Sequence, residues 1–288
     1  TRDEMDQAFT SNEISQVIVF EPGFGRRLER EGEAEIQIIA DASDPNRARL
    51  LAAYTRGIIT SFTGKLAGPK QTPGMISTRI RIAFNPEQKS VFMFVPGVVG
   101  LILMLVCAMM TSISITREKE QGSMETLLVS PLRPAQIIIG KVCPYLLLAF
   151  ADALLIFFLG NVVFGVPVRG PLLLLPAVTL LYIATALSLG IFISTVTESQ
   201  LPAMMISVVG LMLPTILLSG FVFPISNMPQ VLQLISTIVP AKWFLIIIKS
   251  IMLRGNSIPF FWRETLILAA MCAFFLLAGM KRLRMRLE

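Results

Sequence analysis

The stretch Arg117–Lys141 reads REKEQGSMETLLVSPLRPAQIIIGK. It is a charged, polar island between two long apolar runs, Val91–Thr116 before it and Val142–Val168 after it. An apolar run of about 20 residues is long enough to cross a bilayer as a helix. The stretch is therefore predicted to connect two membrane spans, and it contains a short amphipathic segment between Gly122 and Pro131.

The composition is that of a membrane protein. Of 288 residues, 54% are hydrophobic and 15% are charged, whereas about a quarter of the residues of a soluble domain are charged. Residues 1–90 carry about 12 basic and about 12 acidic side chains, so the net charge of +6 arises in the apolar part. Lysine and arginine beside membrane spans determine orientation. The excess of positive charge thus indicates a lipid membrane as partner and no nucleic acid.

Several kinds of chemistry are excluded by the residue types present. The chain has no histidine, and its three cysteines, Cys107, Cys143 and Cys272, fall in or beside apolar runs. These cysteines are expected to be buried small side chains, with no metal site. The sequence contains no GxxxxGK[ST] phosphate loop, so no nucleotide cofactor is expected in this chain. We therefore expect a protein that is not an enzyme.

Residues 1–90 are predicted to form a small α/β domain. Two β-rich runs predict strands over 16–20 and 34–40. A short helix is expected over 22–30, and a longer one from Asp44 and Pro45, a cap and a first helical residue, to about Phe62. The stretch 64–74 is expected to be a loop.

Residues 91–288 are predicted to form the transmembrane domain, with the loop 117–141 and an external re-entrant segment over 224–258. The segment contains two short helices that dip into the membrane without crossing it, Val231–Ile238 and Trp243–Leu253. Five spans are expected, at 91–116, 142–168, 170–197, about 201–223 and 264–280.

Orientation follows from the short connections. Placing Arg117–Lys141 inside gives about eight basic residues in inside segments and about five in outside ones. Residues 1–90 then lie outside and the C-terminus inside. Five spans with an external start imply one further helix upstream, so six helices are expected, five of them in this sequence.

The amphipathic segment has two interpretations. Met124, Leu127 and Leu128 lie near one face of Ser123–Ser130, with Glu120 and Glu125 at polar positions. Such a helix fits a groove on a partner. The same pattern is typical of an interfacial helix that only anchors a loop.

Three residues of the spans are candidates for a substrate path. Asp152 is an acidic residue near mid-membrane, where a carboxylate is costly and often functional; the alternative is a hydrogen-bonded packing residue. Met104 and Met212 belong to a set of methionines that would suit varied apolar substrates, and the alternative is ordinary packing or lipid contact.

Four stretches together resemble permeases of ABC type-2 transporters, most closely the bacterial export subgroup with a large periplasmic domain between the first two helices. The four stretches are Asp41–Asn46, Phe84–Val106, Arg117–Tyr145 and Leu218–Phe244, and the resemblance extends over nearly the whole chain. The resemblance implies the six-helix ABC type-2 permease fold plus the α/β domain. It also implies a bacterial inner membrane location, with residues 1–90 periplasmic and the C-terminus cytoplasmic.

The resemblance implies partners and site residues as well. Two permeases would pair, as a homodimer or with a sister permease, and each would contact a cytoplasmic ATP-binding subunit that holds ATP and magnesium; a periplasmic adaptor is a further expected partner. Glu118–Pro131 would be the coupling helix. Within it and beside it, the match places Arg117, Glu118 and Glu120 at the motor interface, Gly122 at a bend, and Glu125, Leu127 and Leu128 in the groove.

The expected function is export of an apolar or amphiphilic small molecule, such as a drug, a lipid or a siderophore-like compound, driven by a separate ATPase. The alternative is a membrane scaffold or sensor whose external domain binds a ligand. A third class, an integral-membrane enzyme, would need polar clusters in the spans, and Asp152 is the only such feature.

Overall fold

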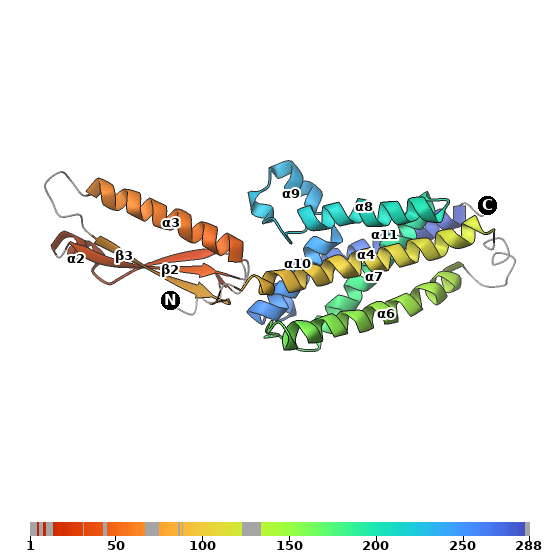
Figure 1. Ribbon diagram of the computed structural model, residues 1–288, viewed down its shortest axis with the longest axis horizontal. Helices are drawn as coiled ribbons and strands as arrows, with labels where there is room; N and C mark the ends of the chain where they lie inside the picture. The colour runs from red at the N-terminus through yellow and green to blue at the C-terminus, as the bar shows by residue number, and fades with distance from the viewer. Residues whose placement is uncertain are drawn as a thin grey trace. The chain divides into compact units, whose positions relative to one another are not determined.

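The protein was analysed as a computed structural model, which describes residues 5, 8–9, 14–30, 32–42, 45–66, 75–85, 87, 89–122 and 134–285. The chain divides into two compact units, Thr1–Met93 and Phe94–Glu288 (Figure 1). Each unit is described by itself below.

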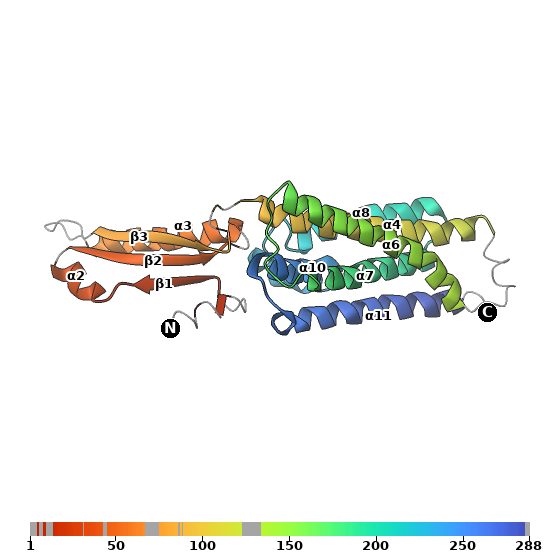
Figure 2. The same ribbon diagram turned by 90° about the horizontal axis from the view of Figure 1, so that it is seen from below.

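The first unit contains a three-stranded sheet with a long helix along it (Figure 2). The strand order is β1-β2-β3; β1 pairs antiparallel with β2, and β2 pairs parallel with β3. A parallel pair needs a crossover, which the long helix α3 provides. The elements are β1 (Gln16–Phe20), α2 (Phe24–Arg30), β2 (Glu33–Asp41), α3 (Pro45–Leu66) and β3 (Met75–Ala83).

The core of this unit lies between α3 and one face of β2. Alternate residues of β2 point to the same face, and Ile36, Ile38 and Ala40 are buried there. Ala40 packs against Ala48 of α3, and Gln16 of β1 donates a hydrogen bond of 2.8 Å to the Thr55 hydroxyl. The small side chains on α3 let the helix approach the sheet closely.

The two predicted strands and two predicted helices are present, although α2 begins at Phe24 and α3 continues past Phe62 to Leu66, into the predicted loop 64–74. The third strand was missed. The segment MISTRIRIA follows the predicted loop and alternates isoleucine with polar residues, as a strand with one buried face does. The predicted cap Asp44 lies outside the described residues.

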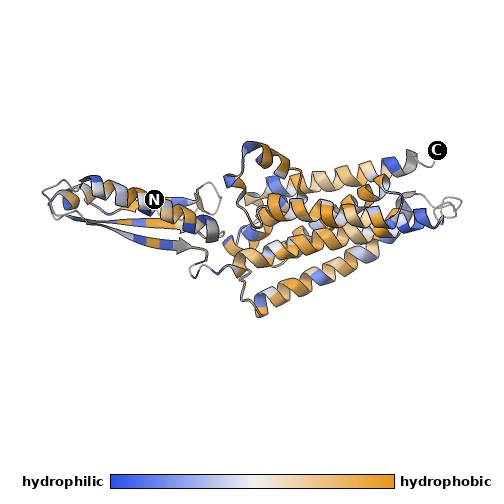
Figure 3. Ribbon diagram, turned by 45° about the horizontal axis from the view of Figure 1, so that its top comes forward, coloured by the Kyte–Doolittle hydropathy of each residue, from blue (hydrophilic) through white to orange (hydrophobic). Residues whose placement is uncertain are grey.

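The second unit is a bundle of long apolar helices (Figure 3). Among the described residues, five helices are long and apolar enough to cross a membrane, as predicted, or six if the bent pair described below counts as one crossing. They are α4 (Val91–Glu120, which begins at the last residues of the first unit), α6 (Pro134–Val162), α7 (Leu174–Val196), α8 (Gln200–Leu218) and α11 (Trp262–Met285).

Helix α7 is the centre of the bundle, with α11 alongside it (Figure 2). Tyr182 of α7 is fully buried, donates a hydrogen bond of 2.7 Å to the Gly100 carbonyl of α4, and stacks on Phe244 with ring centroids 4.0 Å apart. Gly190 allows α4 and α7 to touch, because a side-chain carbon there would lie 2.6 Å from the Ala108 carbonyl oxygen.

Two short helices, α9 (Gln230–Ser236) and α10 (Pro240–Lys249), lie where a re-entrant pair over Val231–Ile238 and Trp243–Leu253 was predicted. They meet at an angle of 85°. The geometry of the pair fits a re-entrant loop and a broken crossing alike. Hydrogen bonds of 2.9 Å cross the bend, from the Lys242 ammonium to the Ser236 hydroxyl and from the Trp243 indole to the Thr237 carbonyl. A π-helical turn, Ser250–Arg254, follows α10.

Several span boundaries differ from the prediction. Helix α6 begins at Pro134 and ends at Val162, before the left-handed Gly165, instead of running from 142 to 168. Proline suits the first turn of a helix because its missing N–H would have no partner there. Helix α8 ends at Leu218, before the left-handed Gly220, and not at Phe223. Helix α4 continues one turn past Thr116, through the charged residues that were expected to end it.

Candidate functional site

The candidate site lies where α4 ends and α6 begins, at the two ends of the predicted coupling segment (Figure 1). The last turn of α4 carries Arg117, Glu118, Lys119 and Glu120. Three of these consecutive side chains bond to three different helices, as described in turn below.

Glu118 forms an ion pair with Lys141 of α6. The two side chains are 26% and 20% exposed, so water screens the attraction only partly. The pair joins the helix that enters the segment 117–141 to the helix that leaves it.

Lys119 donates a hydrogen bond to the backbone carbonyl of Ser194 in the last turn of α7. The last four carbonyls of a helix lack intrahelical partners, and the helix dipole makes this end negative. The positive lysine ammonium is therefore attracted to the C-terminal end of α7 and donates a hydrogen bond that this end lacks.

Glu120 makes the opposite contact at the start of α8. Its carboxylate oxygen accepts two bonds of 3.0 Å, from the backbone N–H and from the side-chain amide of Gln200, the first residue of α8. Ser199, the residue at the cap position, makes no side-chain capping bond. A carboxylate is stabilising at a helix N-terminus, so Glu120 of α4 supplies the cap that α8 lacks within its own sequence.

Gly122 ends this arrangement with a left-handed backbone, φ 71°. Glycine takes this conformation without the steric cost of a Cβ, and it commonly follows the last residue of a helix. Its amide donates to the Lys119 carbonyl at 3.2 Å. The chain therefore leaves the helical path of α4 directly after the three bonded residues.

The remaining predicted coupling residues are Arg117, Glu125, Leu127, Leu128 and Pro131. Arg117 is exposed. Glu125, Leu127, Leu128 and Pro131 lie outside the described residues.

The predicted substrate-path residues have different surroundings. Asp152 lies on an exposed face of α6 and makes no hydrogen bond or ion pair within the described part of the chain. Met212 of α8 is 40% exposed, whereas Met104 of α4 is buried at 1% exposure. Asp152 and Met212 are open to a neighbour, and Met104 belongs to the interior of the bundle.

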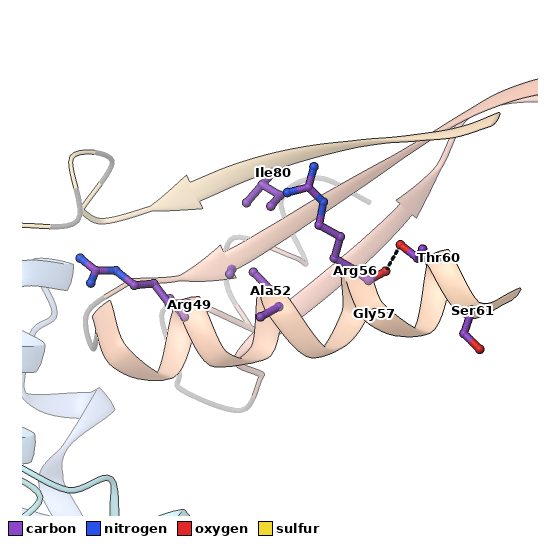
Figure 4. Close-up of a pocket in the computed structure, with 10 residues that line it drawn as sticks. Arg49, Ala52, Arg56, Gly57, Thr60, Ser61 and Ile80 are labelled. Carbon is purple, nitrogen blue, oxygen red and sulfur yellow. Dashed lines mark hydrogen bonds between the residues drawn. The ribbon is translucent and has the colours of Figure 1, made fainter. Parts of the chain in front are cut away.

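Each unit also has a groove. One of about 750 Å³ lies between α3 and β3, with a floor of alanine and glycine (Figure 4). Arg56 extends from α3 toward Ile80 of β3, whereas Arg49 extends from α3 away from Ile80. The other, of about 530 Å³, is apolar and lies between α8 and α9. Within the described ranges, no three histidine, cysteine, aspartate or glutamate side chains come together as metal ligands would.

Comparison with known proteins gives a match to the family described as "ABC-2 family transporter protein" over residues 1–281. The chain belongs to this family.

Its relatives include bacterial permeases. The chain is similar to "Probable multidrug ABC transporter permease YbhS" of Escherichia coli strain K12, with 33% identity over 88% of this chain and 68% of that protein. It is also 33% identical to the permease YbhR of the same strain, over 86% of this chain and 67% of that protein. "Inner membrane transport permease YhhJ" is 29% identical over 99% of this chain and 76% of that protein. No solved structure matches the chain.

In this ABC-2 permease, the internal partners of the α4 end were not found from sequence. Ser194 and Gln200 follow Lys119 and Glu120 by 75 and 80 residues, and no sequence periodicity connects positions that far apart. One signal was available: a lysine and a glutamate lie next to each other at the end of one span, and another span ends close to where the next begins. The opposite charges match those two helix ends.

Proposed function

We propose that this ABC-2 permease is the membrane-spanning subunit of an ATP-driven exporter. It moves an apolar or amphiphilic small molecule out of the cytoplasm or the inner leaflet, and a separate cytoplasmic ATPase powers it. Residues 1–288 contain no phosphate loop, and in this proposal the energy from ATP arrives through a contact with the separate ATPase.

The observation that carries the proposal is the set of bonds at the end of α4. Glu118, Lys119 and Glu120 connect the start of the segment 117–141 to α6, α7 and α8. A displacement of this segment by a partner would therefore act on four helices together, as a coupling element must. A simple membrane anchor has no need of such connections.

The assembly we propose contains two permeases and two ATPase subunits in a bacterial inner membrane, with residues 1–90 periplasmic and the C-terminus cytoplasmic. Arg117, Lys119 and Lys141 at one end of the bundle fit a cytoplasmic surface. The names of YbhS and YbhR as multidrug permeases support an apolar cargo. The uncovered Asp152 and Met212 would face the path or the second permease, and Met104 would join the path only if α4 moved. A periplasmic adaptor would complete an export route.

The test is reconstitution of the permease with the ABC ATPase that co-purifies with it from native membranes. Proteoliposomes loaded with ATP should accumulate or expel a lipophilic fluorescent dye at a rate that depends on ATP hydrolysis. If no ATPase co-purifies and no dye moves, the proposal is wrong.

A ligand sensor is the alternative function, and the groove between α3 and β3 (Figure 4) is the feature it would use. A sensor predicts ligand binding to the first unit without any bound ATPase. The same co-purification experiment separates the two functions.

A further inference from the structure

Lys119 and Glu120 are neighbours in sequence but bond to opposite kinds of helix end. The lysine binds the carbonyl end of α7, and the glutamate binds the amide end of α8. Only three residues, 197–199, lie between Val196, the last residue of α7, and Gln200, the first of α8. Two side chains of α4 thus hold both sides of one tight turn.

The turn also has a polar contact within α7. Thr197 is buried, and its hydroxyl donates back to the Ile193 carbonyl within α7 at 3.1 Å. Val196 is 47% exposed. Lys119 and Glu120, which lie just before the bend at Gly122, join this turn to α4.

We propose that Lys119 and Glu120 form a clamp that makes the α7–α8 turn move with the end of α4. In this proposal, which rests on the proposed function, the two residues transmit force inside the permease and do not dock the ATPase. Force arriving at Gly122 reaches α7, the buried centre of the bundle, and α8, a largely exposed helix, at the same time. Lys119 and Glu120 are positioning residues in this scheme.

The clamp makes a prediction for the permease alone. Glu120→Ala removes the acceptor of both Gln200 hydrogen bonds, so the amides in the first turn of α8 should exchange with deuterium several-fold faster. Glu120→Gln keeps a carbonyl oxygen at the same place and should restore slow exchange. The matched control is Gln121→Ala, because Gln121 is the exposed next residue and should leave exchange unchanged.

The decisive test uses the full permease bound to its co-purified ATPase, with and without a non-hydrolysable ATP analogue. In the wild type, nucleotide should change exchange both in 117–133 and in 197–203. In Glu120→Ala the nucleotide-dependent change in 117–133 should remain and the change in 197–203 should be lost. The amount of ATPase that co-purifies with this variant should stay normal. Lys119→Met removes the bond to α7 and should give the same result as Glu120→Ala. Agreement between the two variants shows that the result does not come from a folding defect of one of them.

Two results would overturn the clamp. One is a nucleotide-dependent change in 197–203 that persists in both variants. The other is loss of ATPase co-purification in Glu120→Ala, which would make Glu120 a docking residue. If the proposed function is wrong, no ATPase is bound to the wild-type permease. The exchange test on the permease alone still tests the clamp in that case.

Discussion

Asp152 is a carboxylate on an apolar helix, and its side chain is exposed. A charged group within a membrane is costly unless a partner or water meets it. Within the described residues it has no hydrogen-bond or ion-pair partner, so the second permease, the cargo or water in the path would have to supply one. This makes Asp152 the residue whose role depends most on the assembly.

We expect Asp152→Asn to reduce ATP-driven dye export several-fold, because the amide keeps the size of the side chain but loses the charge. The measurement is dye efflux from proteoliposomes across neutral pH. Leu148→Ala, an exposed neighbour one turn earlier on α6, is the control. Equal export by the Asn variant at every pH would make Asp152 a packing residue.

The Glu118–Lys141 pair should contribute to stability because it is mostly shielded from water. Glu118→Gln leaves a half-buried ammonium without its carboxylate and should cost about 1–3 kcal/mol. The double variant Glu118→Gln with Lys141→Gln should recover part of this loss, since neither charge then remains unpaired. Thermal unfolding in detergent measures the stability of the single and the double variant. Equal melting temperatures for the wild type and both variants would argue against a stabilising ion pair.

At the scale of helices, the contact between α4 and α7 depends on Gly190. A methyl group at this position would have to push the two backbones apart, so Gly190→Ala should destabilise the protein by about 1–3 kcal/mol. The control is Gly210→Ala on α8, where the added carbon would lie 3.7 Å from Ile206 of its own helix. The account of this contact fails if the two alanine variants unfold at the same temperature.

The elements differ in how well the sequence predicted them, for physical reasons. The long helices and the two short helices α9 and α10 were predicted because apolar runs of membrane length and proline-bounded short runs have few alternatives. β3 was missed because Arg79 and Arg81 on its outer face interrupt the apolar run. Helix ends were displaced where a left-handed glycine, Gly165 or Gly220, stops the helix.

The candidate site was predicted only in part. The segment 117–141 was found from its charge and position, but the bonds of Glu118, Lys119 and Glu120 depend on which helix ends meet in the folded bundle. Hydrophobic patterns place helices in a membrane without ordering them around one another. Such pairings therefore need the structure.

At the scale of the whole molecule, the proposed orientation can be tested by labelling. In a background without Cys107, Cys143 and Cys272, a membrane-impermeant maleimide should modify Tyr54→Cys in intact spheroplasts. Gln121→Cys and Glu198→Cys should react only after permeabilisation, because we place both at the cytoplasmic end. Labelling of Gln121→Cys in sealed cells would show that the orientation is opposite to the one proposed.

The central claim is that the end of α4 passes work from an ATPase to the bundle. The most direct test is the amount of dye exported per ATP hydrolysed, measured for the reconstituted wild type, Glu120→Ala and Glu120→Gln. The account predicts that Glu120→Ala keeps ATP hydrolysis and loses most of the export per ATP, while Glu120→Gln stays close to the wild type. An unchanged ratio in Glu120→Ala would contradict it.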